Sequence, residues 1–181
     1  MNIENQNSPE LAHVAHLIQD IPIAMLTHVQ ADGTLSSRPM SPLEMDAQGA
    51  IWFFVDVRAE QSEHLRTLNL CFSDIGHATY VSIAGTGELD IDIGRAHIKH
   101  LWTPLARPWF PDGPDSEYLA LLKFVPESAD YWDAPNSRMA RAFGVIASVI
   151  SGTPIAMGSH GSISSLAASS SRARTALTSA S

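Results

Sequence analysis

The chain has 181 residues, of which 45% are hydrophobic and 17% are charged. This composition is typical of a globular domain and excludes wholesale disorder, collagen-like chains and coiled coils. Eleven basic residues against nineteen acidic ones give a formal net charge of −8, which argues against electrostatic binding of nucleic acid. The longest apolar runs fall far short of the roughly 20 residues that cross a bilayer, so we expect no membrane partner either.

The N-terminal residues and the cysteine content indicate the compartment. Residues 1–6 are polar and have neither a basic start nor an apolar stretch, so no secretory signal is visible. Cys71 is the single cysteine of the sequence, and one thiol can form neither an internal disulfide nor a cysteine-based metal site. These features fit a reducing compartment, and we expect a cytoplasmic protein.

The first part of the chain predicts a helix followed by a β-hairpin. Ser8 is a plausible N-cap, and the apolar residues that follow Pro9 repeat at helical spacing. Residues 23–29 alternate in the manner of a strand, and Asp32-Gly33 offers the left-handed positions of a tight hairpin turn. Residues 35–41 then return as the second strand.

The middle of the chain predicts a central strand, two further strands and two helices. Residues 51–55 are aromatic and β-branched, which is typical of a strand buried on both faces. Residues 70–73 and 79–89 carry further strand signals. Residues 60–68 and 93–102 have helical periodicity.

Prolines mark the next stretch, 104–114, as a loop without regular structure, because each proline removes a donor and fixes its own backbone angle. Strand character resumes at residues 119–125 and 129–132, and the apolar face of residues 138–150 predicts a last helix. Residues 166–181 are serine-rich and resemble a low-complexity tail.

These elements predict a mostly β chain with packed helices, of the α+β class. Many short strands joined by hairpin turns favour an antiparallel barrel over a parallel βαβ sheet. We expect an N-terminal helix over residues 1–20 and the barrel over 21–133. A C-terminal helix and extension would cover 134–161, and a Ser/Ala-rich tail 162–181.

Several common chemical motifs find little support. Gly85-Thr86-Gly87 lacks the third glycine and the following helix of a dinucleotide-binding loop, so it predicts a bulge or bend within a strand. The pairs His13/His16 and His97/His100 lie three apart on predicted helices, but no carboxylate or cysteine stands at a ligand spacing. We therefore predict no metal site. Ser41 and Ser82 lack the Gly-x-Ser-x-Gly elbow of hydrolases.

Seven short segments, taken in order, carry the most specific signal of the sequence. They are Ala24-Met25-Leu26-Thr27, Ala31-Asp32-Gly33, Ser37-Arg38-Pro39-Met40, Trp52-Phe53-Phe54, the run from Tyr80 to Thr86, Trp109-Phe110-Pro111-Asp112-Gly113-Pro114-Asp115 and Tyr131-Trp132-Asp133. In this order and spacing the chain resembles the pyridoxamine 5'-phosphate oxidase-like flavoproteins, most closely their general stress protein 26 branch. The resemblance runs over residues 21–161.

The resemblance implies an FMN-binding split β-barrel of antiparallel, Greek-key type, and a homodimer with two flavins at the subunit interface. The implied cofactor-binding residues are Arg38, Pro39, Met40 and Ser41 on the second strand, Phe54 and Val55 on the central strand, Tyr80 and Trp132 beside the flavin ring, and Trp109 with Phe110 over it. A flavin phosphate needs a fixed cation and the ring needs apolar walls, which these residue types supply. From the residues alone, Phe54 suits a core, Arg38 a solvated edge and Trp132 a packing contact equally well.

The chain departs from the family pattern after its central strand. Where the family places a serine and a lysine on the phosphate, this chain has Ala59 and Gln61. Hydrogen bonds to charged groups contribute about 1.5–3 kcal/mol each, so their loss weakens FMN binding by roughly two orders of magnitude. We hypothesise that Arg58 partly replaces the lysine, and we keep Gln61 among the cofactor-binding residues. Weak flavin binding, or a preference for FAD or a deazaflavin, is the alternative.

The expected function is that of an FMN-binding redox flavoprotein of the general stress type, leaning to an oxidoreductase with a small-molecule electron donor or acceptor. No residue is identified as a catalytic acid or base. True pyridoxamine phosphate oxidase activity is not expected, because the Arg-x-His segment that holds the substrate phosphate is not evident after Trp132. The alternatives are a non-catalytic flavin or haem protein for storage or stress sensing, and a dimeric scaffold with a decayed site. Gly158-Ser159-His160-Gly161 resembles the family's C-terminal Gly-x-His-Gly, but its role is unassigned.

Overall fold

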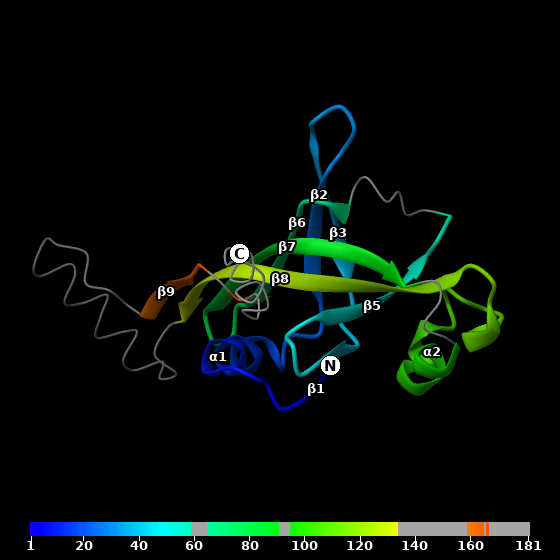
Figure 1. Ribbon diagram of the computed structural model, residues 1–181, viewed down its shortest axis with the longest axis horizontal. Helices are drawn as coiled ribbons and strands as arrows, with labels where there is room; N and C mark the ends of the chain where they lie inside the picture. Colours follow the sequence, from blue (N-terminus) through cyan, green and yellow to red (C-terminus); the bar gives the residue numbers. More distant parts are fainter. Residues whose placement is uncertain (59–64, 91–94, 134–158, 165, 167–181) are drawn as a thin grey trace, which may run out of the picture.

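The computed structural model describes residues 1–58, 65–90, 95–133, 159–164 and 166, and all its strands belong to one sheet (Figure 1). No helix among the described residues has the length and apolar character that a membrane-spanning segment needs. In chain order the elements are β1 (Asn2–Ile3), α1 (Pro9–Ile18), β2 (Ala24–Val29), β3 (Leu35–Met40), β4 (Glu44–Met45), β5 (Ile51–Asp56), β6 (Leu68–Asp74), β7 (Thr79–Asp90), α2 (Arg95–Leu101), the short 3-10 helices η2 (Pro104–Ala106) and η3 (Gly113–Asp115), β8 (Leu119–Asp133) and β9 (Ser159–Ile163).

The sheet has nine strands in the order β1-β4-β5-β8-β7-β6-β2-β3, with β9 paired to β8. Every neighbouring pair is antiparallel except β1 and β4, which run parallel. Among the described strands the two ends of this order, β1 and β3, do not pair with each other, so the sheet is not closed into a full barrel. The predicted mostly β fold with packed helices is confirmed, and the short parallel pair at one edge is the correction.

Helix α1 begins where the sequence predicts. The Leu11 amide donates to the Ser8 side-chain oxygen over 3.2 Å, and Pro9 occupies the first turn, where it needs no hydrogen bond of its own. Its buried side chains are Leu11, Val14, Ala15 and Ile18. They pack into the core on the side of the sheet that we call the inner face.

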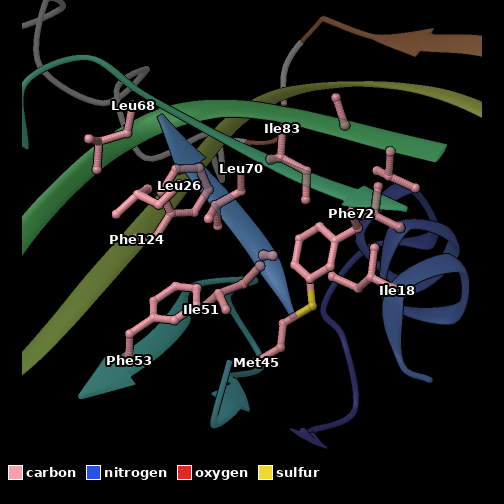
Figure 2. Packing of buried hydrophobic residues seen from close by; sticks show 14 of the residues in the cluster. Ile18, Leu26, Met45, Ile51, Phe53, Leu68, Leu70, Phe72, Ile83 and Phe124 are labelled. Atoms are coloured by element: carbon pink, nitrogen blue, oxygen red, sulfur yellow. The ribbon is translucent and has the colours of Figure 1, made fainter. Parts of the chain in front are cut away.

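The main core fills the inner face (Figure 2). From β5, Ile51, Phe53 and Val55 point into this core, and Trp52 and Phe54 point to the opposite side, the outer face. There they pack in a second apolar cluster with residues of α2 and of the segment that follows it. Both faces of β5 are therefore covered, which confirms the predicted central strand.

Strand β8 is a single element of 15 residues where the sequence predicted two. Its pairing with β7 contains a β-bulge, because Pro126 pairs with Gly85 but Ser128 pairs with Ala84, which leaves Glu127 as the extra residue. A side chain on Gly85 would collide with the backbone carbonyl of the strand opposite. The sequence predicted a bulge or bend within the strand of Gly85, and the register does shift at this point, but the extra residue lies on the opposite strand β8.

The bulge shifts the alternation of side chains along β8. Before it, Leu121 lies in the outer cluster and Leu122 in the inner core. After it, Tyr131 packs against the inner core, and Trp132 lies on the outer face directly opposite Tyr80. Residues on one face of a regular strand are all odd-numbered or all even-numbered. Because of the bulge, Leu121 and Trp132 nevertheless both lie on the outer face, one near each end of β8.

Two predicted loops differ in detail from the structure. In the first hairpin, Gly33 has a positive φ of 82° but Asp32 does not, because the loop closes over five residues from Gln30 to Thr34. The Asp32 carboxylate accepts from the Thr34 amide instead, as an Asx turn does. The proline-rich stretch, predicted to lack regular structure, contains the 3-10 helices η2 and η3.

Part of the predicted helices and tail lies outside the described residues. This holds for residues 60–64 of the predicted helix 60–68, whose last residue, Leu68, begins β6. It also holds for the whole of the predicted helix 138–150 and for most of the tail. Within the described residues, β9 continues to Ile163, and Leu166 is buried with its amide hydrogen-bonded to the Glu127 carbonyl over 2.8 Å.

Candidate functional site

Large apolar side chains remain exposed on the outer face of the sheet away from α2. They are Leu35, Val29, Met25, Tyr80 and Trp132, which lie on β3, β2, β7 and β8. We call this region the open face. A soluble domain seldom leaves several large apolar side chains together on one sheet face, so the open face is a candidate binding surface.

The open face also has a polar strip along its middle. The side-chain Nδ2 of Asn69 donates to the Ser82 hydroxyl oxygen over 2.9 Å, and the Cys71 thiol donates to the side-chain Oδ1 of Asn69 over 2.9 Å. On the next strands, the hydroxyls of Thr27 and Ser37 are 2.7 Å apart and share a hydrogen bond. These side chains bind one another, which leaves the aromatic residues as the groups best placed to contact a ligand.

Tyr80 and Trp132 are directly opposite each other on β7 and β8. Their exposed fractions are 40% and 47%, high values for aromatic residues within a sheet. On the far side of Trp132, β9 places His160 opposite it, with the two ring centroids 5.0 Å apart and their planes tilted by 35°. The structure thus places the two residues predicted to contact a flavin ring directly beside each other. His160 extends this row of side chains by one strand, onto β9.

The covered end of the outer face holds the other predicted aromatic residues. Phe54 contacts the Trp102 ring at 5.7 Å and the Phe110 ring at 6.4 Å between centroids. Phe110 is 8% exposed and packs in this cluster, whereas its neighbour Trp109 is 75% exposed. Of the two residues proposed to lie over a flavin, Trp109 is therefore the one with an available surface.

Arg58 follows β5 and is bound to two neighbours. Its Nε and Nη2 donate to the carboxylate of Asp56, with the Nε to Oδ1 distance 2.9 Å, and its guanidinium lies 3.9 Å from the Tyr118 ring centroid. The side-chain hydrogen bond from Arg58 lowers the pKa of Asp56 from 3.8 to about 2. A phosphate that binds Arg58 would have to compete with this carboxylate.

The β3 residues divide between the two faces. Arg38 pairs with Leu26 and Met40 pairs with Ala24, so both side chains lie on the inner face, where Met40 packs against the core. Pro39 lies on the open face, and Ser41 after the strand is exposed. Val55 is in the core, and Gln61 and Ala59 lie outside the described residues.

In one chain the predicted cofactor-binding residues therefore form three separate groups. One group lies at the inner side of the sheet, one on the open face, and one at the covered end near α2. The inner group consists of Arg38, Met40 and Val55. The group on the open face consists of Pro39, Tyr80 and Trp132. The group at the covered end consists of Phe54, Arg58 and Trp109.

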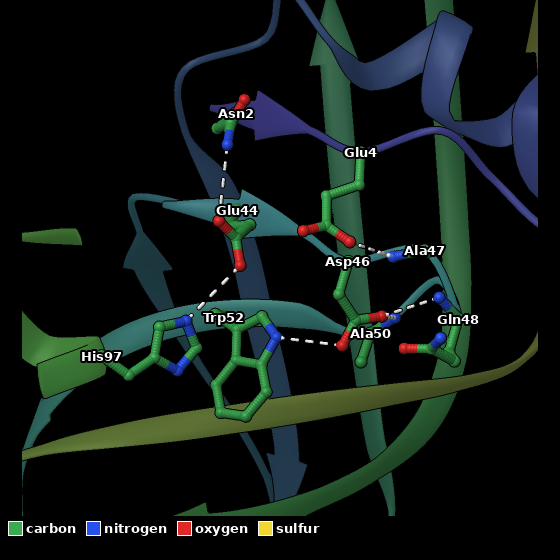
Figure 3. A network of polar contacts seen from close by, with 9 residues as sticks. All are labelled: Asn2, Glu4, Glu44, Asp46, Ala47, Gln48, Ala50, Trp52 and His97. Carbon is green, nitrogen blue, oxygen red and sulfur yellow. Dashed lines mark hydrogen bonds and ion pairs between the residues drawn. The ribbon is translucent and has the colours of Figure 1, made fainter. Parts of the chain in front are cut away.

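A buried polar network fixes α2 to the sheet (Figure 3). Glu44 on β4 is buried, and its carboxylate lies 3.4 Å from the His97 Nε2 of α2. The His97 ring meets the Trp52 ring edge-on at 4.8 Å, and the Trp52 indole donates to Asp46 over 3.2 Å. His97 thus has a structural partner, and no group of three or more metal-ligating side chains occurs in the described part of the chain.

Comparisons with known proteins fit this architecture. Residues 9–155 match the profile of the family described as pyridoxamine 5'-phosphate oxidase like. A candidate general stress protein 26 from a Jannaschia species shares 24% identity and a TM-score of 0.67, over 87% of this chain and 99% of that one. No curated relative matches this chain.

Two further solved structures differ in what their names say they bind. The general stress FMN/FAD binding protein of Xanthomonas citri is 29% identical, with a TM-score of 0.59 over 72% of this chain and 93% of that one. A haem binding protein of Mycobacterium smegmatis is 15% identical, with a TM-score of 0.52 over 68% of this chain and 54% of that one. At this identity the second likeness concerns the fold alone.

Proposed function

Because the chain belongs to the pyridoxamine 5'-phosphate oxidase-like family, we propose that it is a flavin-binding protein of the general stress type that carries out redox chemistry with bound FMN. The observation that carries this proposal is the exposed pair of Tyr80 and Trp132 on neighbouring strands. Two adjacent aromatic side chains offer the flat apolar contact that a flavin ring requires. When bound, the flavin supplies the electron transfer, which ordinary side chains cannot perform.

A second copy of the chain completes this site. Phe54 pairs with Leu121 near one end of β8, and Trp132 lies near the other end, roughly 35 Å away at the usual rise per residue of a strand. A two-fold axis that lies between two packed open faces and runs perpendicular to β8 brings the Trp132 end of one β8 toward the Phe54 end of the other. We therefore propose a homodimer with a flavin at each end of the interface.

The residues present fit the flavin ring better than they fit its phosphate. Tyr80, Trp132 and Trp109 all have exposed aromatic surface. The two cations predicted to bind the phosphate are less available than these aromatic side chains. Arg38 lies on the inner face, and Arg58 is bound to Asp56. In the proposal, Trp132 and Tyr80 orient the ring, and Arg58 exchanges its carboxylate partner for the phosphate.

The alternative is a storage or sensing protein that binds flavin or haem without turnover. The same open face supports it, since a porphyrin is also a flat apolar ring with anionic groups. One relative of the same fold is named as haem binding. Turnover, rather than binding, separates this alternative from the leading proposal.

The deciding experiment is the visible spectrum of the purified protein, followed by titration of stripped protein with FMN, FAD and haem. Flavin bands and FMN binding support the proposal, and NAD(P)H oxidation by the loaded protein with an added acceptor supports the redox role. Trp132→Leu should weaken flavin binding, whereas Leu105→Ala, at an exposed apolar side chain in the segment after α2, should not. A protein that binds haem but no flavin would overturn the proposal.

A further inference from the structure

The segment Gly158-Ser159-His160-Gly161 contains a glycine and a histidine with separate surroundings. Gly161 pairs with Tyr131, and a side chain on Gly161 would collide with the Tyr131 ring, which also meets the His13 ring of α1 at 4.8 Å. This glycine is needed for packing on the inner face. His160 alternates to the open face, where it pairs with Trp132.

The contact between His160 and Trp132 constrains an otherwise exposed indole. The rings lie 5.0 Å apart, and the indole remains 47% exposed. A half-exposed side chain on a strand can adopt several staggered rotamers, and ordering it on binding costs free energy. A ring that already packs against one side of the indole removes part of this cost before a ligand arrives.

We propose that His160 is a positioning residue of the flavin site: its imidazole holds the Trp132 indole in the orientation that packs against the flavin ring. This inference rests on the flavin-binding function proposed above. It concerns the ring and not the phosphate, so His160 contributes equally to the binding of riboflavin and of FMN. The row of Tyr80, Trp132 and His160 across β7, β8 and β9 is then one continuous surface for a planar heteroaromatic ligand.

The position of Trp132 can be tested without any ligand. Protein labelled with 5-fluorotryptophan gives one ¹⁹F resonance for each of its four tryptophans, and Trp132→Phe identifies the resonance of Trp132. In His160→Ala that resonance should shift and sharpen, because the ring neighbour is lost and the indole moves more freely. His160→Phe should restore the wild-type linewidth. His16→Ala, at an exposed histidine of α1, should leave all four resonances unchanged. An unchanged Trp132 resonance in His160→Ala would overturn the inference.

The effect on binding follows from the same variants. His160→Ala should weaken the binding of riboflavin and the binding of FMN by the same factor, about three- to tenfold. This is the cost expected for one side chain that must be ordered on binding. In a double-mutant cycle, His160→Ala combined with Trp132→Ala should bind no more weakly than Trp132→Ala alone, because His160 acts through the indole. Additive losses would contradict a positioning role.

The two proposals fail in different ways. If wild-type protein binds no flavin at all, the proposed function is wrong and the ligand half of this inference falls with it. If wild-type protein binds flavin and His160→Ala binds it equally well, the proposed function stands and His160 has no part in it. Thermal unfolding of each variant shows whether a loss of binding reflects unfolding instead, and His160→Phe provides the folded comparison.

Discussion

Arg58 and Asp56 form a two-point ion pair at the end of the central strand, in which Nε and Nη2 of the arginine donate to the two carboxylate oxygens. The same guanidinium lies over the Tyr118 ring, so its orientation is set from two directions. This arrangement bears on both the titration of Asp56 and the proposed binding of phosphate.

We first predict that Asp56 titrates with a pKa of about 2, because its hydrogen bonds from Arg58 favour the charged form. The folded-state pKa is depressed, so the pair contributes stability above the unfolded pKa near 4. That contribution is lost as the pH falls through about 2. NMR titration of the carboxyl carbons measures this pKa. In Arg58→Gln it should return toward 3.8, and an unchanged value there would contradict the assignment to Arg58.

A second prediction concerns the phosphate of FMN. If Arg58 binds this phosphate, Arg58→Gln should weaken the binding of FMN by about ten- to a hundredfold, the range for a hydrogen bond to a charged group. The affinity for riboflavin, which has no phosphate, should be unchanged. Asp56→Asn should have the opposite effect, because it releases the guanidinium from its competing carboxylate. Calorimetric titration with both ligands measures the two ratios. Equal FMN affinity in all three proteins would exclude Arg58 from the phosphate site.

Third, the contact between His97 and Glu44 should matter more for stability than a surface ion pair on the same helix. His97→Ala leaves the buried Glu44 carboxylate without this partner, which we expect to cost about 1–3 kcal/mol in urea unfolding. The control is Lys99→Ala, which removes an exposed pair with Asp115 and should cost under about 0.5 kcal/mol. Similar costs for the two variants would mean that the network in Figure 3 does not hold α2 in place.

Fourth, Gly85→Ala should destabilise the fold by about 1–3 kcal/mol or more, because the new methyl group would fall on the Val125 carbonyl and meet the Phe124 ring. Gly76→Ala is the matched control in the turn between β6 and β7, where a methyl group would approach only the Asp74 side chain, at 3.2 Å. Denaturant midpoints of the two variants make the comparison. A Gly85→Ala midpoint equal to that of wild type would show that the bulge relaxes at little cost.

Fifth, the proposed homodimer should depend on the open face. Met25→Arg introduces a charge into that face and should give a monomer at concentrations where the wild type is dimeric, with weaker flavin binding as a consequence. Ile75→Arg, at a more exposed apolar residue in the turn after β6, should leave the dimer intact. Sedimentation velocity separates the two states. A dimer that persists in Met25→Arg would place the interface elsewhere.

The elements that the sequence predicted well depend on local signals. The cap at Ser8 and the apolar spacing behind it specify α1 without reference to the rest of the chain. The composition of residues 51–55 likewise predicted a strand with both faces covered. The division of β8 into two strands was wrong, because Pro126 and Glu127 interrupt the alternation and only the register with β7 shows that pairing continues.

The candidate site was predictable only in part, since its geometry is non-local. Tyr80 and Trp132 were singled out through the family resemblance, but their direct opposition follows from a register that no local pattern encodes. The structure separates Phe54 and Trp132 along β8, which a list of residues could not show. The sequence did not single out His160, which we propose as a positioning residue, although the Gly-x-His-Gly string contains it.

Glu127, the extra residue of the bulge, shifts the alternation of side chains along β8 by one position. Deleting Glu127 would restore strict alternation and leave the register beyond it unchanged, with Tyr131 still inward and Trp132 still outward, because Ser128 would directly follow Pro126 as Ala84 directly precedes Gly85. A β8 that kept Glu127 but paired regularly, without the bulge, would instead place Tyr131 opposite Tyr80 and turn Trp132 toward the core. The single unpaired residue of the bulge therefore decides that the indole of Trp132, and not the phenol of Tyr131, lies on the open face.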